Sequence, residues 1–312
     1  MENIIEVKNI TKRFKEKLVL DNISYEVNKG EIFGFIGPNG AGKSTLINIM
    51  TGILVPNNGT ISICGYDILK EPIKAKSCIG YVPQEIALIE EINAYANLEY
   101  FGALYGLKGK VLKERINEAL EITGLSEKKK EKVKKFSGGM KRRLNIAAAI
   151  MHYPKVLILD EPTVGVDPQS RNHIFDFVRS VTKEYGTTVV YTSHYMEEVE
   201  ELCDRVFIMD LGKEVAYGNK EEVKASVFPN NKVIIEVSDL VGENLLELKN
   251  VNGVLNVSQE ENNLILTISE EFKLAQVLFF LEKNNKTIKK ITYDEAKLED
   301  VFLALTGKSL RD

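Results

Sequence analysis

The stretch GPNGAGKST, which begins at Gly37, combines glycines, a lysine and hydroxyl side chains at a spacing suited to phosphate binding. It fits the pattern G-x-x-x-x-G-K-[ST], follows an apolar strand pattern and opens a helical one. Gly40 and Gly42 would let the backbone wrap the phosphates. Lys43 would bring its charge to the β- and γ-phosphates, and Ser44 would offer its hydroxyl to Mg²⁺. The stretch therefore predicts a site for a nucleoside triphosphate.

Two adjacent carboxylates, Asp160 and Glu161, follow the apolar run VLIL. In a P-loop nucleoside triphosphatase an aspartate at this place holds the metal ion, which is the role we expect for Asp160. Glu161 would polarise the attacking water as general base. Two acids at the end of a strand can also be solvated turn residues, but the phosphate loop in the same chain favours the catalytic interpretation.

Two further polar residues follow predicted strands, at the edge where ligands bind in α/β sheets. His194 ends the strand pattern TTVVYTSH and could donate a hydrogen bond to the γ-phosphate. Gln84, in YVPQE, could touch a metal-bound water and sense the γ-phosphate through its amide. By itself, each residue is more often structural than functional. The other histidines, His152 and His173, lie in helical patterns and are interpreted as structural.

A second turn with free backbone donors lies far downstream, in the stretch KKFSGGMKRRLNIAAAI. Ser137, Gly138 and Gly139 precede a basic and then apolar helix, and backbone N–H groups are left bare at a helix start. Such an end suits an anion. The chain thus has two helix starts that could each face a phosphate group. The basic residues after the turn either help to neutralise phosphate or form a solvated helix face.

The elements that must position these residues alternate between strand and helix over the first two thirds of the chain. Strands are expected over residues 4–10, 18–27, 31–37, 59–65, 78–84, 155–162 and 187–194, with a hairpin over 205–218. Helices are expected over 43–52, 92–107, 111–125 and 167–186, besides the helix after the Ser-Gly-Gly turn. The pattern is typical of an α/β protein.

The composition shifts near residues 224–232, and the order of elements changes beyond that point. Expected are strand 232–238, helix 241–250, strands 253–259 and 262–269, helix 270–283, strand 286–293 and helix 295–306. This βαββαβ order matches the ferredoxin-like unit with one added helix. We expect a linker at 227–231 and a small α+β domain at 232–312. Because that part has no Cys, His or glycine-rich loop, a regulatory or dimerisation role is favoured over catalysis.

The bulk composition excludes several classes of protein. The 312 residues are 44% hydrophobic and 28% charged, as in ordinary globular domains, and the net charge of −4 offers no basic field for nucleic acid. The three cysteines are far apart and suggest a reducing compartment. The start of the chain does not resemble a signal peptide, and no run of 18 apolar residues predicts a membrane span. A role at a membrane would therefore need another chain.

In this order, the motifs resemble those of the nucleotide-binding subunit of ATP-binding cassette (ABC) transporters, over residues 3–225. The resemblance implies a RecA-like P-loop core with an antiparallel β subdomain, and a helical signature subdomain at about 85–152, within an ATPase domain at 1–226. It implies ATP and Mg²⁺ as ligands, with Glu161, His194 and Lys43 as catalytic residues and Ser44, Gln84 and Asp160 at the metal. Nucleotide contacts are then expected from Phe14, Gly37, Asn39, Gly40, Ala41, Gly42, Lys43, Ser44, Thr45, Gln84, Ser137, Gly138, Gly139 and Asp167.

The resemblance also explains the second anion-binding helix start, at the Ser-Gly-Gly turn. In this family two subunits, identical or different, dock head to tail, and the Ser-Gly-Gly turn of one covers the γ-phosphate held by the other. Met140 departs from the family's usual glutamine and lacks its amide donor. Phe14, otherwise an edge-strand aromatic, matches the residue that stacks on adenine. Residues 85–107, rich in apolar and aromatic side chains, are expected partly in the core and partly against a membrane-spanning partner.

The end of the chain, KLEDVFLALTGKSLRD, resembles ATPases that drive bacterial exporters of drugs, lipids, polysaccharides or ions. We therefore expect an ATPase subunit that powers export through a separate permease, cytoplasmic and peripheral at the inner face of the cell membrane. The alternative is a soluble ABC ATPase that acts on ribosomes or DNA. A single continuous cassette without heptad repeats disfavours this alternative. The transported substrate is not encoded in this chain.

Overall fold

The computed structural model describes residues 2–238 and 245–307. The chain divides into two compact units, one formed by Met1–Lys220 with the residues from Leu305 onward, the other by Glu221–Ala304. The predicted domain limits at 226 and 231 stay a prediction. Within the described ranges, no helix combines the length and the apolar character that a membrane span requires.

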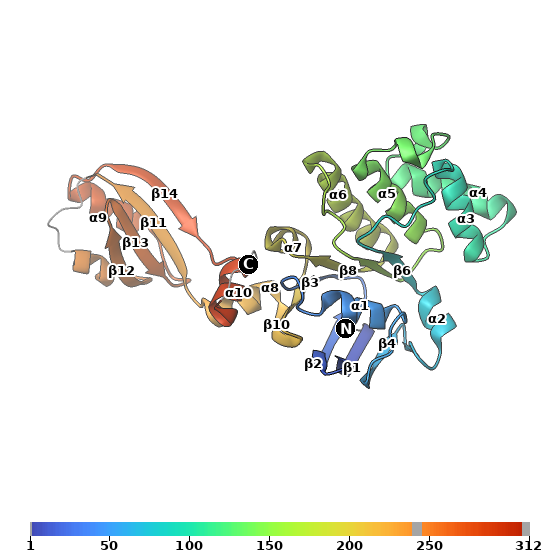
Figure 1. The fold of residues 1–312 in the computed structure, drawn as a ribbon. Coiled ribbons are helices and arrows are strands. Elements are labelled where there is room, and N and C mark those ends of the chain that lie inside the picture. Colours follow the sequence, from blue (N-terminus) through green and yellow to red (C-terminus); the bar gives the residue numbers. More distant parts are fainter. Residues whose placement is uncertain (1, 239–244, 308–312) are drawn as a thin grey trace. The chain divides into compact units, whose positions relative to one another are not determined.

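The centre of the first unit is a six-stranded sheet in the order β10-β9-β3-β8-β7-β6 (Figure 1). Only β10 is antiparallel to its neighbour. Every residue of β3, β7 and β8 is buried, which accounts for the apolar sequences of β3 and β7, whereas β8 also carries hydroxyl side chains. The strands are β3 (Ile32–Ile36), β6 (Ile79–Val82), β7 (Val156–Leu159), β8 (Thr188–Ser193), β9 (Arg205–Asp210) and β10 (Lys213–Asn219).

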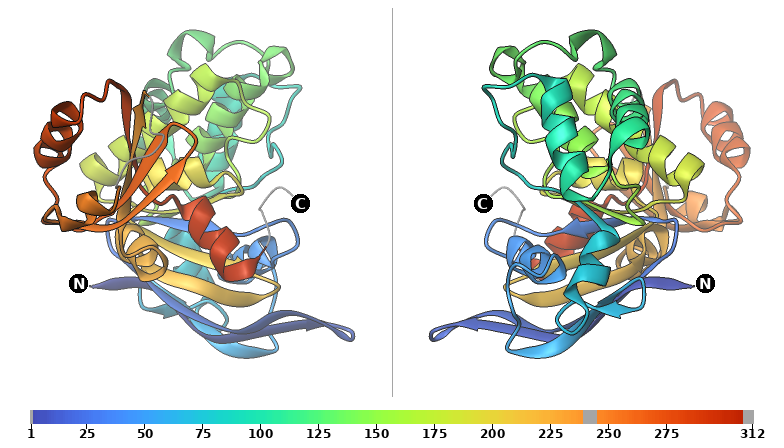
Figure 2. Two further views of the ribbon diagram at one scale, coloured as in Figure 1. Left: turned by 90° about the vertical axis from the view of Figure 1, so that its left-hand side faces the viewer. Right: turned by 90° about the vertical axis from the view of Figure 1, so that its right-hand side faces the viewer.

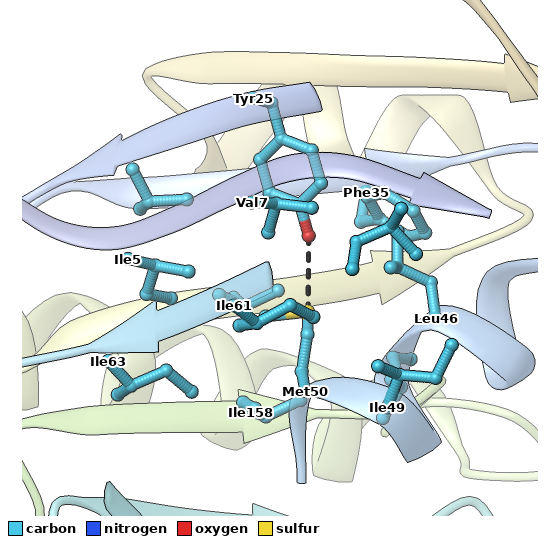
Figure 3. Close-up of a cluster of buried hydrophobic side chains, with 14 of the residues drawn as sticks. Ile5, Val7, Tyr25, Phe35, Leu46, Ile49, Met50, Ile61, Ile63 and Ile158 are labelled. Atoms are coloured by element: carbon cyan, nitrogen blue, oxygen red, sulfur yellow. Dashed lines mark hydrogen bonds between the residues drawn. The ribbon is translucent and has the colours of Figure 1, made fainter. Parts of the chain in front are cut away.

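A second, antiparallel sheet has the order β2-β1-β4-β5 and shares its core with the first. In this core, Val7 and Ile61 of the antiparallel sheet pack with Met50 of α1 and with Ile158 of β7, and the Tyr25 hydroxyl donates to Met50 Sδ at 3.1 Å (Figure 3). The helix that follows the phosphate loop is thus clamped between two sheets. The elements are β1 (Asn3–Phe14), β2 (Lys17–Asn28), β4 (Asn58–Ile63), β5 (Tyr66–Asp67) and α1 (Lys43–Met50).

Helices cover the side of the six-stranded sheet that faces away from the antiparallel sheet, as Figure 1 and Figure 2 both show. Among them α3, α4 and α5 contact one another and form the helical subdomain. Three elements without counterpart in the sequence-based expectation are the short helices α2, α7 and α8, each of eight residues or fewer. The helices of the first unit, besides α1, are α2 (Pro72–Ser77), α3 (Ala94–Leu104), α4 (Gly109–Ile122), α5 (Gly138–Ala149), α6 (Pro168–Tyr185) and α7 (Met196–Leu202). The helix α8 (Lys220–Val227) lies where the second unit begins in the chain.

The second unit contains an antiparallel sheet in the order β12-β13-β11-β14. In chain order of the unit this is 2-3-1-4, which confirms the ferredoxin-like arrangement. The expected helix at 241–250 is a 3₁₀ helix, η3, over Leu245–Asn250, and residues 241–244 lie outside the described ranges. The other elements are β11 (Asn231–Val237), β12 (Val254–Glu260), β13 (Asn263–Ile268), α9 (Leu274–Lys283), β14 (Ile288–Asp294) and α10 (Leu298–Thr306).

Candidate nucleotide site

The phosphate loop connects β3 to α1 and is built around two glycines with positive φ. Gly40 has φ +82° and Gly42 has φ +113°, which other residues rarely adopt. A Cβ added at Gly42 would lie 2.8 Å from Leu20 Cδ2, so this glycine is also required by packing. The carbonyl of Ala41 accepts a hydrogen bond from Gly212 N at 2.9 Å. The loop is thus held by the β2 strand and by the turn between β9 and β10.

The face of the loop that carries Asn39, Gly40 and Ser44 is exposed, and Thr45 is half-buried. Gly37 lies beneath it, where an added Cβ would come within 2.5 Å of the Met209 carbonyl oxygen. A buried base with an exposed rim leaves the loop's backbone free to contact a ligand from solvent. This is the arrangement expected of a phosphate cradle.

Lys43 is buried within the curve of the loop and is only 5% exposed. Its Nζ donates to the carbonyl oxygens of Gly37 at 2.5 Å and Pro38 at 3.3 Å, and lies 3.6 Å from Glu161 Oε1. Burial lowers the pKa of the Lys43 ammonium, and the Glu161 carboxylate opposes that shift. The loop's own carbonyls and one carboxylate therefore hold a cation where phosphate charge is expected.

Asp160 and Glu161 follow β7 and are both buried, at 6% and 7% exposure. Thr192 Oγ1 donates to Asp160 Oδ1 at 2.9 Å and accepts from Glu161 N at 2.9 Å. Burial raises the pKa of Asp160, although the hydrogen bond from Thr192 works against the shift. Glu161 has φ +46°, a left-handed conformation that is strained for a glutamate. One threonine of the neighbouring strand thus fixes both acids, and the solvated-turn alternative is wrong for this pair.

The ends of three neighbouring strands meet at the Glu161 carboxylate. Gln84, which follows β6, donates through Nε2 to Glu161 Oε2 at 3.2 Å. His194, which follows β8, places Nδ1 3.2 Å from the same oxygen, without the alignment of a hydrogen bond. With Lys43 on the other oxygen, four of the predicted residues surround one site. The strand order β8-β7-β6, which the sequence does not state, brings them together.

Phe14 lies at the end of β1 and is 44% exposed. The ammonium of Lys12 lies 5.0 Å from the centre of its ring, which is a cation–π distance. An exposed aromatic ring fits stacking on a planar base, and the adenine-stacking role of Phe14 stays a prediction.

The Ser-Gly-Gly turn begins α5, and its two glycines have different surroundings. The Ser137 side chain caps the helix, since its Oγ accepts from Met140 N at 3.3 Å. A Cβ added at Gly139 would lie 2.1 Å from Ser170 Oγ in α6, whereas the atom nearest to one at Gly138 is 3.8 Å away. Gly139 is therefore required by packing within the chain, and Ser137 with Gly138 forms the exposed part of the turn.

Asp167 precedes α6 and accepts from Ser170 N through Oδ1 at 2.9 Å. It is the N-cap of this helix, and these backbone hydrogen bonds lower the pKa of its carboxyl. Asp167 Oδ2 would also lie 3.1 Å from a Cβ at Gly139. Residues 163–167, which match the D-loop of the family, and the Ser-Gly-Gly turn are therefore neighbours in one chain. A nucleotide contact from either segment stays a prediction.

Arg142 is a residue of the site that the sequence-based interpretation missed. It belongs to the basic run after the Ser-Gly-Gly turn, but it is only 4% exposed. Its guanidinium donates to the carbonyl oxygen of Pro83 at 2.7 Å and to that of Gln84 at 2.5 Å. The helix α5, which follows the Ser-Gly-Gly turn, therefore holds the backbone of the segment around Gln84, which is called the glutamine loop below. A buried arginine cannot be distinguished by sequence from its half-buried basic neighbours, Lys141 and Arg143.

Glu198 of α7 is a second missed residue, 3% exposed. Its Oε2 accepts hydrogen bonds from the hydroxyls of Thr163 at 2.8 Å, Tyr191 at 2.9 Å and Ser193 at 2.9 Å. A buried carboxylate with three donors is well satisfied and rigid. Glu198 therefore connects the end of β8, which directly precedes His194, with the D-loop at Thr163.

We expect Arg142→Met to lower ATP hydrolysis about tenfold with little change in ATP affinity, because the glutamine loop loses the donors that fix its backbone while the phosphate loop is untouched. Arg143→Met is the matched control, since Arg143 donates instead to the carbonyl oxygens of Thr123 and Gly124. Steady-state phosphate release and ATP titration separate turnover from binding. Equal turnover in the two variants would contradict the positioning role of Arg142.

The comparisons with known proteins identify the family of the chain. A family model described as "ABC transporter" matches residues 20–164, and one described as "ATP-binding protein DrrA1-3-like, C-terminal domain" matches residues 218–306. The chain is 44% identical over 312 residues to the linearmycin resistance ATP-binding protein LnrL of Bacillus subtilis (strain 168), covering 99% of this chain and 100% of that protein. It is 34% identical to the daunorubicin resistance ATP-binding protein DrrA3 of Streptomyces coeruleorubidus, covering 99% and 98%.

Solved structures give the same result for the first unit. CbiO1 from Clostridium perfringens, described as part of the ABC transporter complex cbiONQ, superposes with a TM-score of 0.67 at 32% identity, covering 72% of this chain and 92% of that one. The ATP-binding cassette MJ0796, solved as a dimer in a post-hydrolysis state with ADP and Pi, gives a TM-score of 0.64 at 26% identity, covering 69% and 98%.

The fold and the site together define a P-loop ATPase of the cassette type, which binds and hydrolyses ATP. The chain belongs to the ATP-binding proteins of ABC transporters. Its function is accordingly that of a transporter ATPase.

Proposed function

We propose that this chain powers an exporter as a head-to-tail dimer of nucleotide-binding subunits, coupled to a separate membrane-spanning permease. The observation that carries the proposal is the Glu161 carboxylate at the end of β7, which is contacted from the ends of the two neighbouring strands and from the phosphate loop. Export is supported by the names of relatives concerned with linearmycin resistance, daunorubicin resistance and Nod factor export. This proposal places the chain at the inner face of the cell membrane, where it binds the permease.

In the proposed mechanism each side chain acts at a stated place. Lys43 leaves the carbonyl of Gly37 to pair with phosphate oxygens. Glu161 accepts a proton from the attacking water, and its burial strengthens this interaction. Gln84 Nε2 holds the carboxylate in position, and His194 donates a hydrogen bond to the γ-phosphate.

The residues at the site fit Mg²⁺, which prefers oxygen ligands and usually keeps substrate phosphates and water among them. The oxygens of Ser44, Gln84 and Asp160 are the donors we assign to it. Asp160 Oδ1 accepts from Thr192 at 2.9 Å and Oδ2 accepts from the Tyr81 hydroxyl at 3.5 Å, and these two donors would orient the carboxylate for the ion. When bound, the ion would neutralise charge on the phosphates. Among the described residues there is no group of three His, Cys, Asp or Glu side chains that could hold a metal ion, consistent with a site shared with the substrate.

The permease contact is assigned to the exposed part of residues 85–107. Tyr100, Leu104 and Tyr105 of the α3 region and Ile89 of the preceding loop are 49%, 65%, 44% and 38% exposed. Ala94 and Leu98 of the same segment are buried in the helical subdomain and are therefore not part of the proposed contact. An exposed cluster of large apolar and aromatic side chains fits an amphipathic helix of a partner.

The head-to-tail arrangement is tested with mixed dimers that carry Glu161→Gln in both chains to prevent turnover. The first dimer has Lys43→Ala on one chain and Gly138→Asp on the other. The second has both changes on one chain and pairs it with an otherwise unchanged partner. We use Gly138 because a side chain there has space, whereas one at Gly139 would collide with Ser170 of its own chain. Aspartate would face the γ-phosphate with a like charge.

If each site combines the phosphate loop of one chain with the signature turn of the other, both defects of the first dimer fall in one site. The expected result is one tightly bound ATP in the first dimer and none in the second. Bound nucleotide per tag-purified dimer is the measurement, with Gly138→Ala in place of Gly138→Asp as the control. One ATP in the second dimer and none in the first would show instead that each site is completed within one chain.

A further inference from the structure

One face of the four-stranded sheet in the second unit is open. The opposite face is buried in a core that includes Val233, Ile235 and Leu266 with residues of α9 (Figure 1). The strand register gives three cross-strand rows on the open face. In order across β14, β11, β13 and β12 they are Asp294–Lys232–Thr267–Asn256, Thr292–Ile234–Ile265–Ser258 and Lys290–Glu236–Asn263–Glu260.

None of these twelve residues is buried by the part of the chain that the structure describes. The central row places two isoleucines, Ile234 and Ile265, directly opposite each other on the two inner strands. The flanking rows carry the charges. A sheet face with an apolar centre and a charged margin suits packing against a second sheet, with the apolar residues covered and the charges at the rim.

The charges make the open face complementary to itself. On β11, Lys232 and Glu236 lie two residues on either side of Ile234, and on β14, Lys290 and Asp294 are placed in the same way around Thr292. A two-fold axis along the central row stacks each strand on its own counterpart in the opposite direction. Lys232 of one copy then faces Glu236 of the other.

The same operation places Lys290 of one copy opposite Asp294 of the other. By symmetry, each of the two kinds of charge pair occurs twice. Ile234 and Ile265 meet their own counterparts on the axis. A two-fold axis parallel to the strands would instead place Lys232 of one copy opposite Thr267 of the other, and Glu236 opposite Asn263. None of the charge pairs would form in that arrangement.

We propose that this face is a self-association surface through which the second units of two copies of the chain pair about a two-fold axis. The isoleucines supply apolar contact, and the charge pairs set register and orientation. The contact involves no nucleotide, so it goes beyond the ATP-driven contact of the cassettes. The face is small compared with the roughly 800 Å² per partner of a standard interface, so the association is weak by itself. Tethering to the cassette raises its effective concentration once cassettes meet.

The proposal is tested in the full chain with EDTA and without nucleotide, by sedimentation velocity over a range of protein concentrations. Lys232→Glu and Glu236→Lys are each expected to weaken self-association about tenfold or more, because two attractive pairs per dimer become repulsive. The double variant restores association, since each changed residue again faces the opposite charge. An equimolar mixture of the two single variants also restores it, as mixed dimers.

Each single variant also sets like charges side by side within its own sheet, Lys232→Glu beside Asp294 and Glu236→Lys beside Lys290. The double variant keeps both local faults, so its recovery cannot come from repair within one sheet. Thermal unfolding of every variant checks the fold. A double variant no stronger than the single ones, or single variants equal to the unchanged chain, overturns the proposal.

Disulfide cross-linking supplies a measurement that detects weak association. With the half-buried Cys64 changed to Ser in all variants, Ile265→Cys lies on the axis and is expected to cross-link to its own counterpart. Thr267→Cys, one step off the axis, is the control: it should cross-link when mixed with Asn263→Cys and not by itself. The absence of an Ile265→Cys cross-link, or an equal yield from Thr267→Cys alone, overturns the proposal. Neither result would affect the ATP-driven dimer, which the nucleotide-occlusion experiment tests separately.

Discussion

Glu161→Gln is expected to reduce ATP hydrolysis by roughly 10²-fold or more while ATP binding is kept. Glutamine retains the shape of the side chain, so the strand end and the contacts from Thr192 to the backbone remain. It cannot accept the proton of the attacking water. Because ATP then persists in the site, the variant should form dimers with ATP and Mg²⁺ that the unchanged chain forms only transiently.

Two measurements check this expectation: phosphate release under saturating ATP and size-exclusion chromatography with ATP and Mg²⁺. Glu85→Gln is the matched control, since Glu85 is an exposed acid next to Gln84 and has no place in the proposed mechanism. The control should hydrolyse ATP at the normal rate and show no increase in dimer when ATP and Mg²⁺ are added. Retention of more than about a tenth of normal turnover by Glu161→Gln would remove Glu161 from the role of base.

Lys43→Ala is expected to abolish hydrolysis and to weaken ATP binding by about 10²-fold, the equivalent of one or two charge-assisted hydrogen bonds. The buried ammonium is the cation within the phosphate loop, and without it the Glu161 carboxylate repels phosphate charge with no cation at 3.6 Å. The loss should appear in both the affinity and the turnover. Lys43→Glu would act in the same direction by adding a second repelling charge.

Lys43→Met separates the charge from the volume of the side chain. It keeps a long side chain in the buried position and should fail as completely as Lys43→Ala. Titration with a fluorescent ATP analogue measures affinity, and thermal unfolding shows that both variants fold. Turnover near the normal value at saturating ATP would exclude the phosphate loop from the mechanism.

Much of the fold was predictable because its signals are local. Buried strands such as β3 and β7 are short apolar runs, and α6 has Asp167 as its cap and Pro168 at its first turn. The ferredoxin-like order of the second unit followed from strand and helix patterns in the same way. The short helices α2, α7 and α8 were missed because a helix of two turns shows little periodicity. The 3₁₀ form of η3 likewise depends on packing rather than on composition.

By itself, the sequence determined the chemistry of the candidate site. The phosphate loop, the acid pair after β7 and the positions of Gln84 and His194 depend on residue type and on spacing within single segments. Only the tertiary structure decided which groups meet. The order of strands in the sheet brings Gln84 and His194 to the Glu161 carboxylate, and that order depends on pairing between strands that are distant in sequence.

The tertiary structure also decided the roles of residues whose partners are distant in sequence. Arg142 was indistinguishable from its basic neighbours until its guanidinium was seen on the carbonyls of Pro83 and Gln84, nearly sixty residues earlier in the chain. Gly138 and Gly139 are identical in sequence terms, yet α6 packs against only one of them. Such distinctions arise from long-range packing, because burial and hydrogen bonding between segments are properties of the folded chain and not of any one segment.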